Sequence, residues 1–274
     1  MTAVLLAVSS AALFGGMTVA FRVGLRGLTA PEAALATIVP ALAVCVVAAA
    51  VRHDPHGAWP FFLTGLLAPG ISQIFFTLGI REIGASRASV TVGSAPLVAV
   101  VIALVFLGEP VRVALLVGAA AIVTGGVLLA AERDRPGHLR ARGLLFAALC
   151  AVLFAIRDNL ARALHADATP ETAAAAILLA GVLCSGLWAR RVPSRVELRR
   201  LAPAGLLFGI SYVCLFEAYW RGRVTVVSPL VATESLWGVA LSALLVRQSE
   251  GMGRRIFVGA LLVVAGGVLI GATR

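Results

Sequence analysis

The residues best placed to do chemistry are ionisable side chains that interrupt long apolar runs of this 274-residue chain. Glu234 is the clearest case, about ten residues inside the apolar run 225–246. At about 1.5 Å per residue, that position lies near the midplane of a membrane-spanning helix. A charged group there is costly unless it is paired or wetted, so it is a functional candidate by default. Its carboxylate can take up and release a proton; the alternative is a neutral, hydrogen-bonded structural glutamate.

Three further ionisable residues lie nearer to the ends of two other apolar runs, namely Arg157, Asp158 and Glu217. Acid-first spacing of four residues predicts that Asp158 pairs with Arg162 and that Glu217 pairs with Arg221. Arginines that neutralise nearby acids in this way are the purely structural alternative. Arg157 has no such local partner, so we expect it to meet the neighbours of Asp158, Glu217 or a carboxylate of a bound solute.

Acid, base and aromatic groups together predict a polar vestibule that leads toward Glu234. Such a lining suits a zwitterionic or cationic amphipathic solute, such as an amino acid, because phosphate recognition needs several convergent cations. The first half of the chain adds uncharged polar groups. The candidate substrate-binding residues are therefore Glu234, Trp237, Thr233, Arg157, Asp158, Tyr212, Glu217, Gln73, Ser94 and Thr91.

Composition indicates that lipid surrounds these residues. Sixty per cent of the chain is hydrophobic, 13% is charged, and the mean hydropathy is +1.00. The net charge of +10 comes from arginines that lie between apolar runs, which favours anchoring at membrane edges over nucleic-acid binding. The four cysteines and four histidines lack metal-ligand spacing, so we expect neither a metal nor a cofactor.

Ten apolar runs are long enough to cross about 30 Å of hydrocarbon. Short arginine-bearing loops separate them, and none of these loops is large enough to fold as a soluble domain. Pro69-Gly70 and Pro96 are expected to loosen the third and fourth helices. The runs lie near 2–21, 31–51, 59–80, 85–107, 112–131, 143–164, 170–189, 202–220, 225–246 and 255–272.

The chain also repeats itself without gaps. Residues 117–128 (VGAAAIVTGGVL) recur as 258–269 (VGALLVVAGGVL), and Gly65-Leu66-Leu67 recurs as Gly205-Leu206-Leu207. Chance similarity between apolar segments is the alternative, but the offset stays nearly fixed over many helices. Two units of five helices each must have opposite orientations in the membrane.

We therefore predict an all-α integral membrane protein of ten transmembrane helices, built as two inverted five-helix repeats over 1–131 and 142–273. Loops after the odd-numbered helices hold 16 of the 23 arginines, which favours termini outside the cell. No metal cluster, Ser–His pairing or phosphate-cradling loop is apparent in the sequence, so an enzyme is not expected.

Several local sequences carry a family resemblance: Leu13-Phe14-Gly15, Gly84-Ala85-Ser86, Leu107-Gly108-Glu109, Gly118 with Gly125-Gly126, and Ser228-Pro229. With these marks the whole chain resembles the ten-helix EamA-type branch of the drug/metabolite transporter superfamily. Phe14 stands where that family usually has tryptophan.

The resemblance implies a secondary active transporter in the bacterial inner membrane that works by alternating access. Its expected partners are a small-molecule substrate, the lipid bilayer and H⁺ as a coupling ion, without nucleic acid. Export of amino acids or related metabolites is the leading expectation. A lipid-linked sugar flippase or a drug efflux carrier of the same fold is the alternative.

Overall fold

The computed structural model describes residues 1–52, 56–83, 91–110, 112–130, 141–166, 168–234, 236–238, 240–241 and 254–272. The regular elements within these ranges are helices, and no strand occurs among them. In chain order the elements are α1 (Thr2–Gly24), α2 (Ala30–Arg52), α3 (Ala58–Gly65), η1 (Leu66–Ile71), α4 (Ser72–Ile83), α6 (Ala95–Phe106), α7 (Val113–Ala130), α8 (Ala141–Ala163), α9 (Pro170–Trp188), α10 (Arg195–Arg221), α11 (Val224–Val231) and α13 (Arg254–Ala272).

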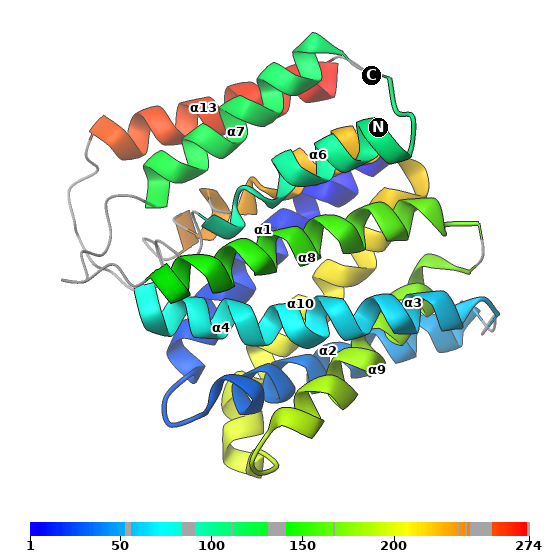
Figure 1. The fold of residues 1–274 in the computed structure, drawn as a ribbon, viewed down its shortest axis with the longest axis vertical. Helices are drawn as coiled ribbons and strands as arrows, with labels where there is room; N and C mark the ends of the chain where they lie inside the picture. The colour runs from blue at the N-terminus through cyan, green and yellow to red at the C-terminus, as the bar shows by residue number, and fades with distance from the viewer. Residues whose placement is uncertain are drawn as a thin grey trace.

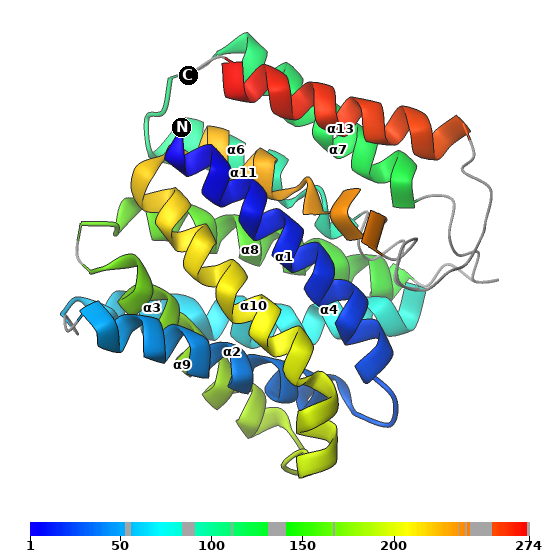
Figure 2. The same cartoon turned by 180° about the vertical axis from the view of Figure 1, so that it is seen from behind.

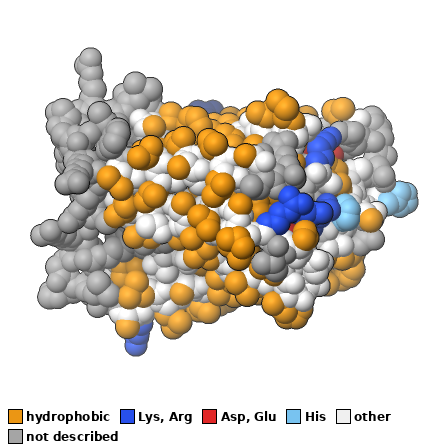
Figure 3. Space-filling model, turned by 90° about the horizontal axis from the view of Figure 1, so that it is seen from above, with side chains coloured by type: hydrophobic (Ala, Val, Ile, Leu, Met, Phe, Trp, Pro, Cys, Tyr) orange, Lys and Arg blue, Asp and Glu red, His pale blue; other side chains and the backbone are white. Residues whose placement is uncertain are grey.

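Six helical segments of the described chain are long and apolar enough to cross a membrane. They are α1, α2, the broken segment Ala58–Ile83, α8, α9 and α10, while α6, α7 and α13 are shorter apolar helices. The predicted runs 85–107 and 225–246 are described only in part, through α6 and α11. Hydrophobic side chains are spread over the described part of the face in Figure 3, and most of the arginine and histidine drawn on it lies toward one end. This pattern fits a multi-pass protein whose apolar sides contact lipid.

The third apolar run is broken where the sequence predicts it. α3 and α4 flank the π-helical segment η1, inside which Ala68 leaves the helical region with φ −144° and ψ 113°. Pro69 follows directly, and proline removes a helix hydrogen bond and crowds the preceding turn. Pro96 instead lies in the first turn of α6, where its missing N–H costs little. Both prolines therefore divide apolar runs into shorter helices.

The helices form one bundle with two distinct edges. α7 and α13 lie side by side at one edge, and α2, α3 and α9 gather toward the other (Figure 1 and Figure 2). Between the edges, α10 packs against both α1 and α2, and α8 packs against α4 and α6. The N-terminus and the last turn of α13 lie at the same end of the bundle (Figure 1).

Close backbone contacts occur at glycines that the sequence repeat relates to one another. A Cβ added to Gly65 would lie 2.3 Å from the Ile177 carbonyl oxygen, and one added to Gly205 would lie 2.6 Å from that of Thr37. Gly65 and Gly205 are 140 positions apart, and so are Thr37 and Ile177. The same pair of helix faces therefore meets twice: a first-half glycine packs on the second half at Ile177, and a second-half glycine packs on the first half at Thr37. Small residues permit this approach, which is how membrane helices gain packing energy.

The edge formed by α7 and α13 repeats this reciprocity within a single pair of helices. A Cβ at Gly125 would lie 2.5 Å from the Gly259 carbonyl oxygen, and one at Gly266 would lie 2.6 Å from that of Gly118. An offset of 141 residues exchanges these two contacts. The glycines therefore allow close helix packing inside one chain, as the repeated sequence predicts.

Replacing Gly266 with alanine is expected to destabilise this edge, since the added methyl group meets backbone that cannot move aside. Overpacking of this kind costs about 1–3 kcal/mol. The adjacent Gly267→Ala is the matched control, because its Cβ would meet only Leu230, at 3.7 Å. Thermal unfolding of the detergent-purified variants should show a lower midpoint for Gly266→Ala alone. Equal midpoints for the two variants would contradict the packing argument.

Candidate functional site

A small cavity of about 50 Å³ lies where the two halves of the chain meet. This volume accommodates a few water molecules. Its lining comes from α1, α6, α8, α10 and α11 and from the short segments that follow α4 and α11. The lining residues are Ser10, Phe14, Val92, Gly93, Ala95, Pro96, Phe154, Arg157, Asp158, Leu215, Ser228, Val231, Ala232 and Glu234.

A buried ion pair forms the polar wall of this cavity. Arg157 and Asp158 are neighbours in α8 and are only 5% and 6% exposed. Arg157 Nε and Nη2 both donate to Asp158 Oδ1, at 2.8 and 2.6 Å. Two buried charges are tolerated when they neutralise each other and their remaining polar atoms find partners. The long arginine side chain folds back onto its own neighbour to achieve this.

Groups from two other helices complete the pair. Arg157 Nη1 donates to the Tyr212 hydroxyl at 2.7 Å, and Tyr212 is fully buried in α10. The guanidinium also lies 4.9 Å from the Phe154 ring centre and 5.4 Å from that of Tyr212, within cation–π range. Ser228 of α11 donates to Asp158 Oδ2 at 3.4 Å. The ion pair therefore ties α8 to α10 and α11.

The position of α11 depends on a carboxylate from the other half of the chain. Gly108 ends α6 with φ +62°, the left-handed conformation that glycine adopts most readily. The turn brings Glu109 to the start of α11, where its two carboxylate oxygens accept from Val224 N and Thr225 N at 2.9 and 3.0 Å. An acid at a helix N-terminus satisfies unpaired N–H groups and complements the helix dipole. Glu109 thereby holds the helix that carries Ser228.

Glu234 lies just beyond α11 and lines the cavity, half-buried. Arg157 and Asp158 line the same cavity. The 234–238 backbone packs directly on α1: a Cβ added to Gly15 would lie 2.8 Å from the Glu234 carbonyl oxygen and from Gly238 N. Gly15 therefore lets α1 approach closely enough to form the cavity wall next to Glu234. The carboxylate that the sequence singled out therefore lines the cavity beside the ion pair.

Two buried polar contacts hold the helices around the cavity in register. Ser10 of α1 and Ser211 of α10 each donate to the other's carbonyl oxygen, at 3.0 and 2.9 Å. Asn159 of α8 donates to the carbonyl oxygens of Ala99 in α6 and Ala155, at 3.0 and 2.9 Å. Interhelical hydrogen bonds of this kind are favoured in lipid because water is absent. In this structure these bonds join α1 to α10 and α6 to α8 around the cavity.

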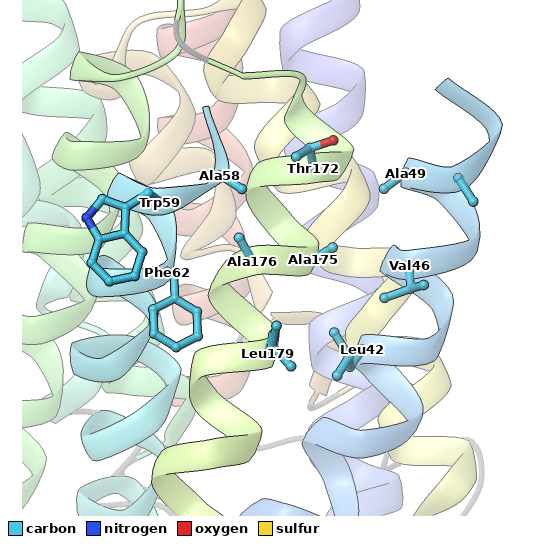
Figure 4. A pocket seen from close by; sticks show the side chains of 11 residues that line it. Leu42, Val46, Ala49, Ala58, Trp59, Phe62, Thr172, Ala175, Ala176 and Leu179 are labelled. Carbon is cyan, nitrogen blue, oxygen red and sulfur yellow. The ribbon is translucent and has the colours of Figure 1, made fainter. Parts of the chain in front are cut away.

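A larger groove of about 890 Å³ lies elsewhere, between α2, α3 and α9 (Figure 4). Its lining is apolar apart from Thr172, and Trp59 stacks on Phe62 at 5.8 Å beside it. Substrate sites combine an apolar wall with a few convergent polar groups, which this groove lacks. We therefore assign the candidate site to the smaller cavity, where ionisable groups converge.

The structure brings some predicted site residues together and separates others. Arg157, Asp158 and Glu234 line the cavity, and Tyr212 supports it from behind. The Thr233 hydroxyl donates to the Leu230 carbonyl oxygen within its own turn, at 2.7 Å. The remaining predicted residues do not line the cavity. Trp237 is 36% exposed, Glu217 pairs with Arg221, and Gln73 is buried in α4. Ser94 and Thr91 bond to each other, since Ser94 Oγ donates to the Thr91 carbonyl oxygen.

One predicted pairing is wrong and one is confirmed. Glu217 does pair with Arg221 in the last turns of α10. Asp158, however, pairs with Arg157 and not with Arg162. Arg162 instead donates to the carbonyl oxygens of Tyr219 and Trp220, at 3.0 and 3.3 Å, because helix C-terminal carbonyls attract cations.

Sequence reasoning did not identify Ser10, Phe154 and Ser228 as site residues, although all three line the cavity. Phe154 lies one turn before Arg157, a spacing that places the ring against the guanidinium. Ser10 is a single small polar residue in an apolar run and gives no such signal. Among the described residues, no three His, Cys, Asp or Glu side chains are placed to hold a metal ion.

Comparison with known proteins shows the family to which the chain belongs. The model of the EamA-like transporter family matches the chain twice, over residues 1–131 and 141–272. The chain belongs to the EamA-like transporter family. It is therefore a multi-pass membrane protein of the drug/metabolite transporter superfamily, whose EamA members are transporters rather than enzymes. No curated protein matches it by sequence.

One solved crystal structure, titled only as that of a protein, is similar to the chain in fold. It aligns over 99% of this chain and 96% of its own, with a TM-score of 0.84 at 20% sequence identity. This likeness supports the helical arrangement of the EamA-like chain. At that identity it carries no information on the substrate.

Removing Asp158 is expected to destabilise the EamA-like fold strongly, because Arg157 would remain charged in the interior. Breaking a buried pair from one side costs roughly 3–5 kcal/mol, whereas replacing both partners with apolar groups is often nearly neutral. Asp158→Ala should therefore lower the thermal midpoint in detergent, and the double variant Arg157→Met/Asp158→Ala should recover most of it. The i,i+4 pair Glu217–Arg221, whose arginine is 44% exposed, is the control, and its loss should cost less than the loss of the fully buried pair.

Replacing Glu109 is expected to weaken the start of α11. Loss of a capping side chain costs about 1 kcal/mol, so Glu109→Ala should lower the thermal midpoint by a few degrees. Glu109→Gln keeps one accepting oxygen and should lose about half as much. If Glu109→Ala is as stable as the parent chain, the carboxylate does not hold α11.

Proposed function

We propose that this transporter moves amino acids or related small metabolites across the bacterial inner membrane by alternating access around the cavity. The observation that carries the proposal is that both halves of the chain line one cavity that contains buried ionisable groups. Ser10, Phe14 and Pro96 come from the first half, and Arg157 and Glu234 come from the second. Sites between repeats are typical of secondary transporters.

Two features support an inverted arrangement of the two halves. The paired glycine contacts are exchanged by the sequence offset, as expected if a two-fold axis relates the units. The equivalent helix pairs also pack alike, since α1 contacts α10 much as α8 contacts α4. We propose domain boundaries at 1–131 and 142–273 on this basis. Separately, the family resemblance leads us to propose that net transport is outward.

The size of the cavity supports a conformational cycle. A space of about 50 Å³ is too small for an amino acid, so binding requires the walls to separate. The break at η1 and the start of α6 after Ser94 are places where a helix can bend without losing internal hydrogen bonds. We propose that the halves rock about these positions and that this motion alternates access to Glu234.

The alternative functions fit the site less well. A flippase for lipid-linked sugars requires a polar head-group pocket that opens to lipid, but the lateral groove of Figure 4 is apolar apart from Thr172. A drug efflux carrier would use the same cavity and the same carboxylate. It differs from the proposed metabolite carrier only in its range of substrates.

Glu234→Gln is expected to abolish transport driven by a pH gradient while exchange of unlabelled for labelled solute continues in part. The amide retains hydrogen bonding but cannot carry a proton. The measurement is uptake into proteoliposomes loaded with a mixed pool of amino acids and their amines, with and without a pH gradient. Glu197→Gln is the control, because Glu197 lies in the exposed capping box of α10 and glutamine also serves there. Full gradient-driven flux in Glu234→Gln would rule out coupling through this residue.

A further inference from the structure

We propose that the groove between α2, α3 and α9 is a binding site for one acyl chain of a membrane phospholipid. The groove is separate from the cavity between the two halves, and its ligand is not the transported solute. Four features carry this assignment: the depth of the groove in the membrane, the anchoring of its walls, the chemistry of its lining and its continuity with the lipid-facing surface.

The groove lies at the depth of the hydrocarbon core. Each helix that bounds it belongs to a segment long and apolar enough to span a membrane. Its lining on α2 runs from Leu42 to Ala50, which is about 12 Å along the helix. One leaflet contributes about 15 Å of the hydrocarbon core, so the groove follows most of one leaflet. Water is scarce at that depth, and a space of about 890 Å³ must therefore be filled by apolar atoms.

Both walls of the groove are anchored on α9. At the end of α3, Gly65 lies directly against the backbone of Ile177. On the side of α2, Ile38 packs against Gly181 of α9, where an added Cβ would lie 3.5 Å from the Ile38 Cδ1 atom. Small residues allow these close approaches, which hold membrane helices together. Closing the groove would require both contacts to break, so the space between the walls is left to a ligand.

The lining of the groove suits a flexible chain of methylene groups. α9 lies between α2 and α3 and contributes the small side chains of Ala175 and Ala176, with the Phe62 ring of α3 to one side (Figure 4). Thr172 supplies the polar atom of the lining, and its hydroxyl already accepts from Thr169 Oγ1 at 2.9 Å. A chain in the groove gains dispersion contacts from three helices and meets no polar group that requires a partner.

The groove is continuous with the surface that faces lipid. Val47 of α2, Leu63 of α3 and Leu183 of α9 lie outside its lining, and their side chains are 66%, 47% and 49% exposed. Acyl chains that surround these residues reach the groove from the side, without passing through the protein. This continuity identifies the occupant as lipid.

The ends of the three helices orient the bound lipid. α2 ends at Arg52, while α3 begins at Ala58 and α9 at Pro170, so one end of the groove lies where these termini meet. Trp59 lies at that end and is 68% exposed, and an amphipathic ring of this kind is typical of a membrane interface. α3 also begins without a side-chain cap, which leaves the positive end of its dipole next to the headgroup phosphate. The headgroup therefore stays at the interface while the chain extends toward Leu42.

The test uses the fluorescence of Trp59, which lines the groove. A variant of the full chain keeps Trp59 and has phenylalanine in place of the other three of its four tryptophans. Phosphatidylglycerol with brominated acyl chains, which quench indole emission on contact, is titrated into this variant in detergent. We expect a saturable loss of emission that is complete near one lipid per chain. A second variant that keeps only Trp188, exposed at the end of α9 and outside the lining, should lose emission without saturation.

Groove-filling variants and mass measurements complete the test. Ala175→Phe should remove the saturable loss, whereas Val47→Phe, on the lipid-facing surface of α2, should retain it. Native mass spectrometry of the unaltered chain should show one retained phospholipid, which decides the matter if the tryptophan variants do not fold. Equal, unsaturated quenching of Trp59 and Trp188 would overturn the proposal, because the groove would then be ordinary lipid-facing surface. Absence of quenching at Trp59 would overturn it as well, and a dimeric mass would then identify a second copy as the occupant. Neither result bears on the proposed transport.

Discussion

The organisation of this transporter depends on one constraint, which is that two opposite charges are buried side by side in α8. Removing a guanidinium and a carboxylate from water is expensive unless their hydrogen bonds are satisfied. Arg157 and Asp158 meet this requirement with Tyr212 from α10 and Ser228 from α11. The pair therefore dictates which helices surround α8, and it fixes the cavity on the side where Glu234 lies. A helix displaced from this set would leave a charge without its partner.

Close packing by small residues makes that arrangement possible. Lipid offers no hydrophobic driving force between helices, so contact area and hydrogen bonds must supply it. Gly15 brings α1 onto the Glu234 segment, and Gly65 and Gly205 bring their helices onto α9 and α2. Glu109 adds a polar link by capping α11 from the end of α6. Contacts between the two halves thus position the ionisable residues of the cavity lining, although Arg157, Asp158 and Glu234 all belong to the second half.

The sequence predicted the helices better than it predicted the contacts between them. Long apolar runs and Pro69 indicate spans and a break, because hydrocarbon thickness and proline chemistry act locally. Glu234, deep in its run, does line the cavity, whereas Arg157 lies nearer to the end of its run and is nevertheless buried. The partner of Asp158 did not follow from spacing, since the Tyr219 and Trp220 carbonyl oxygens from another helix compete for Arg162. Gln73 and Trp237 lie outside the cavity for the same reason: helix rotation is set by packing, which no single run encodes.

The two halves share one sequence repeat but contribute different side chains to the cavity, since its ionisable lining residues all come from the second half. Gly93 and Glu234 are equivalent positions of the repeat, and both line the cavity, one without a side chain and one with a carboxylate. Met17 and Thr18, the counterparts of Arg157 and Asp158, lie in α1, where Met17 is buried in the apolar core and Thr18 bonds its own helix. An exact two-fold arrangement would duplicate the buried ion pair and double its desolvation cost. With the charged lining residues confined to one half, the frame can remain nearly symmetric, and the cost of burying an ion pair arises only once.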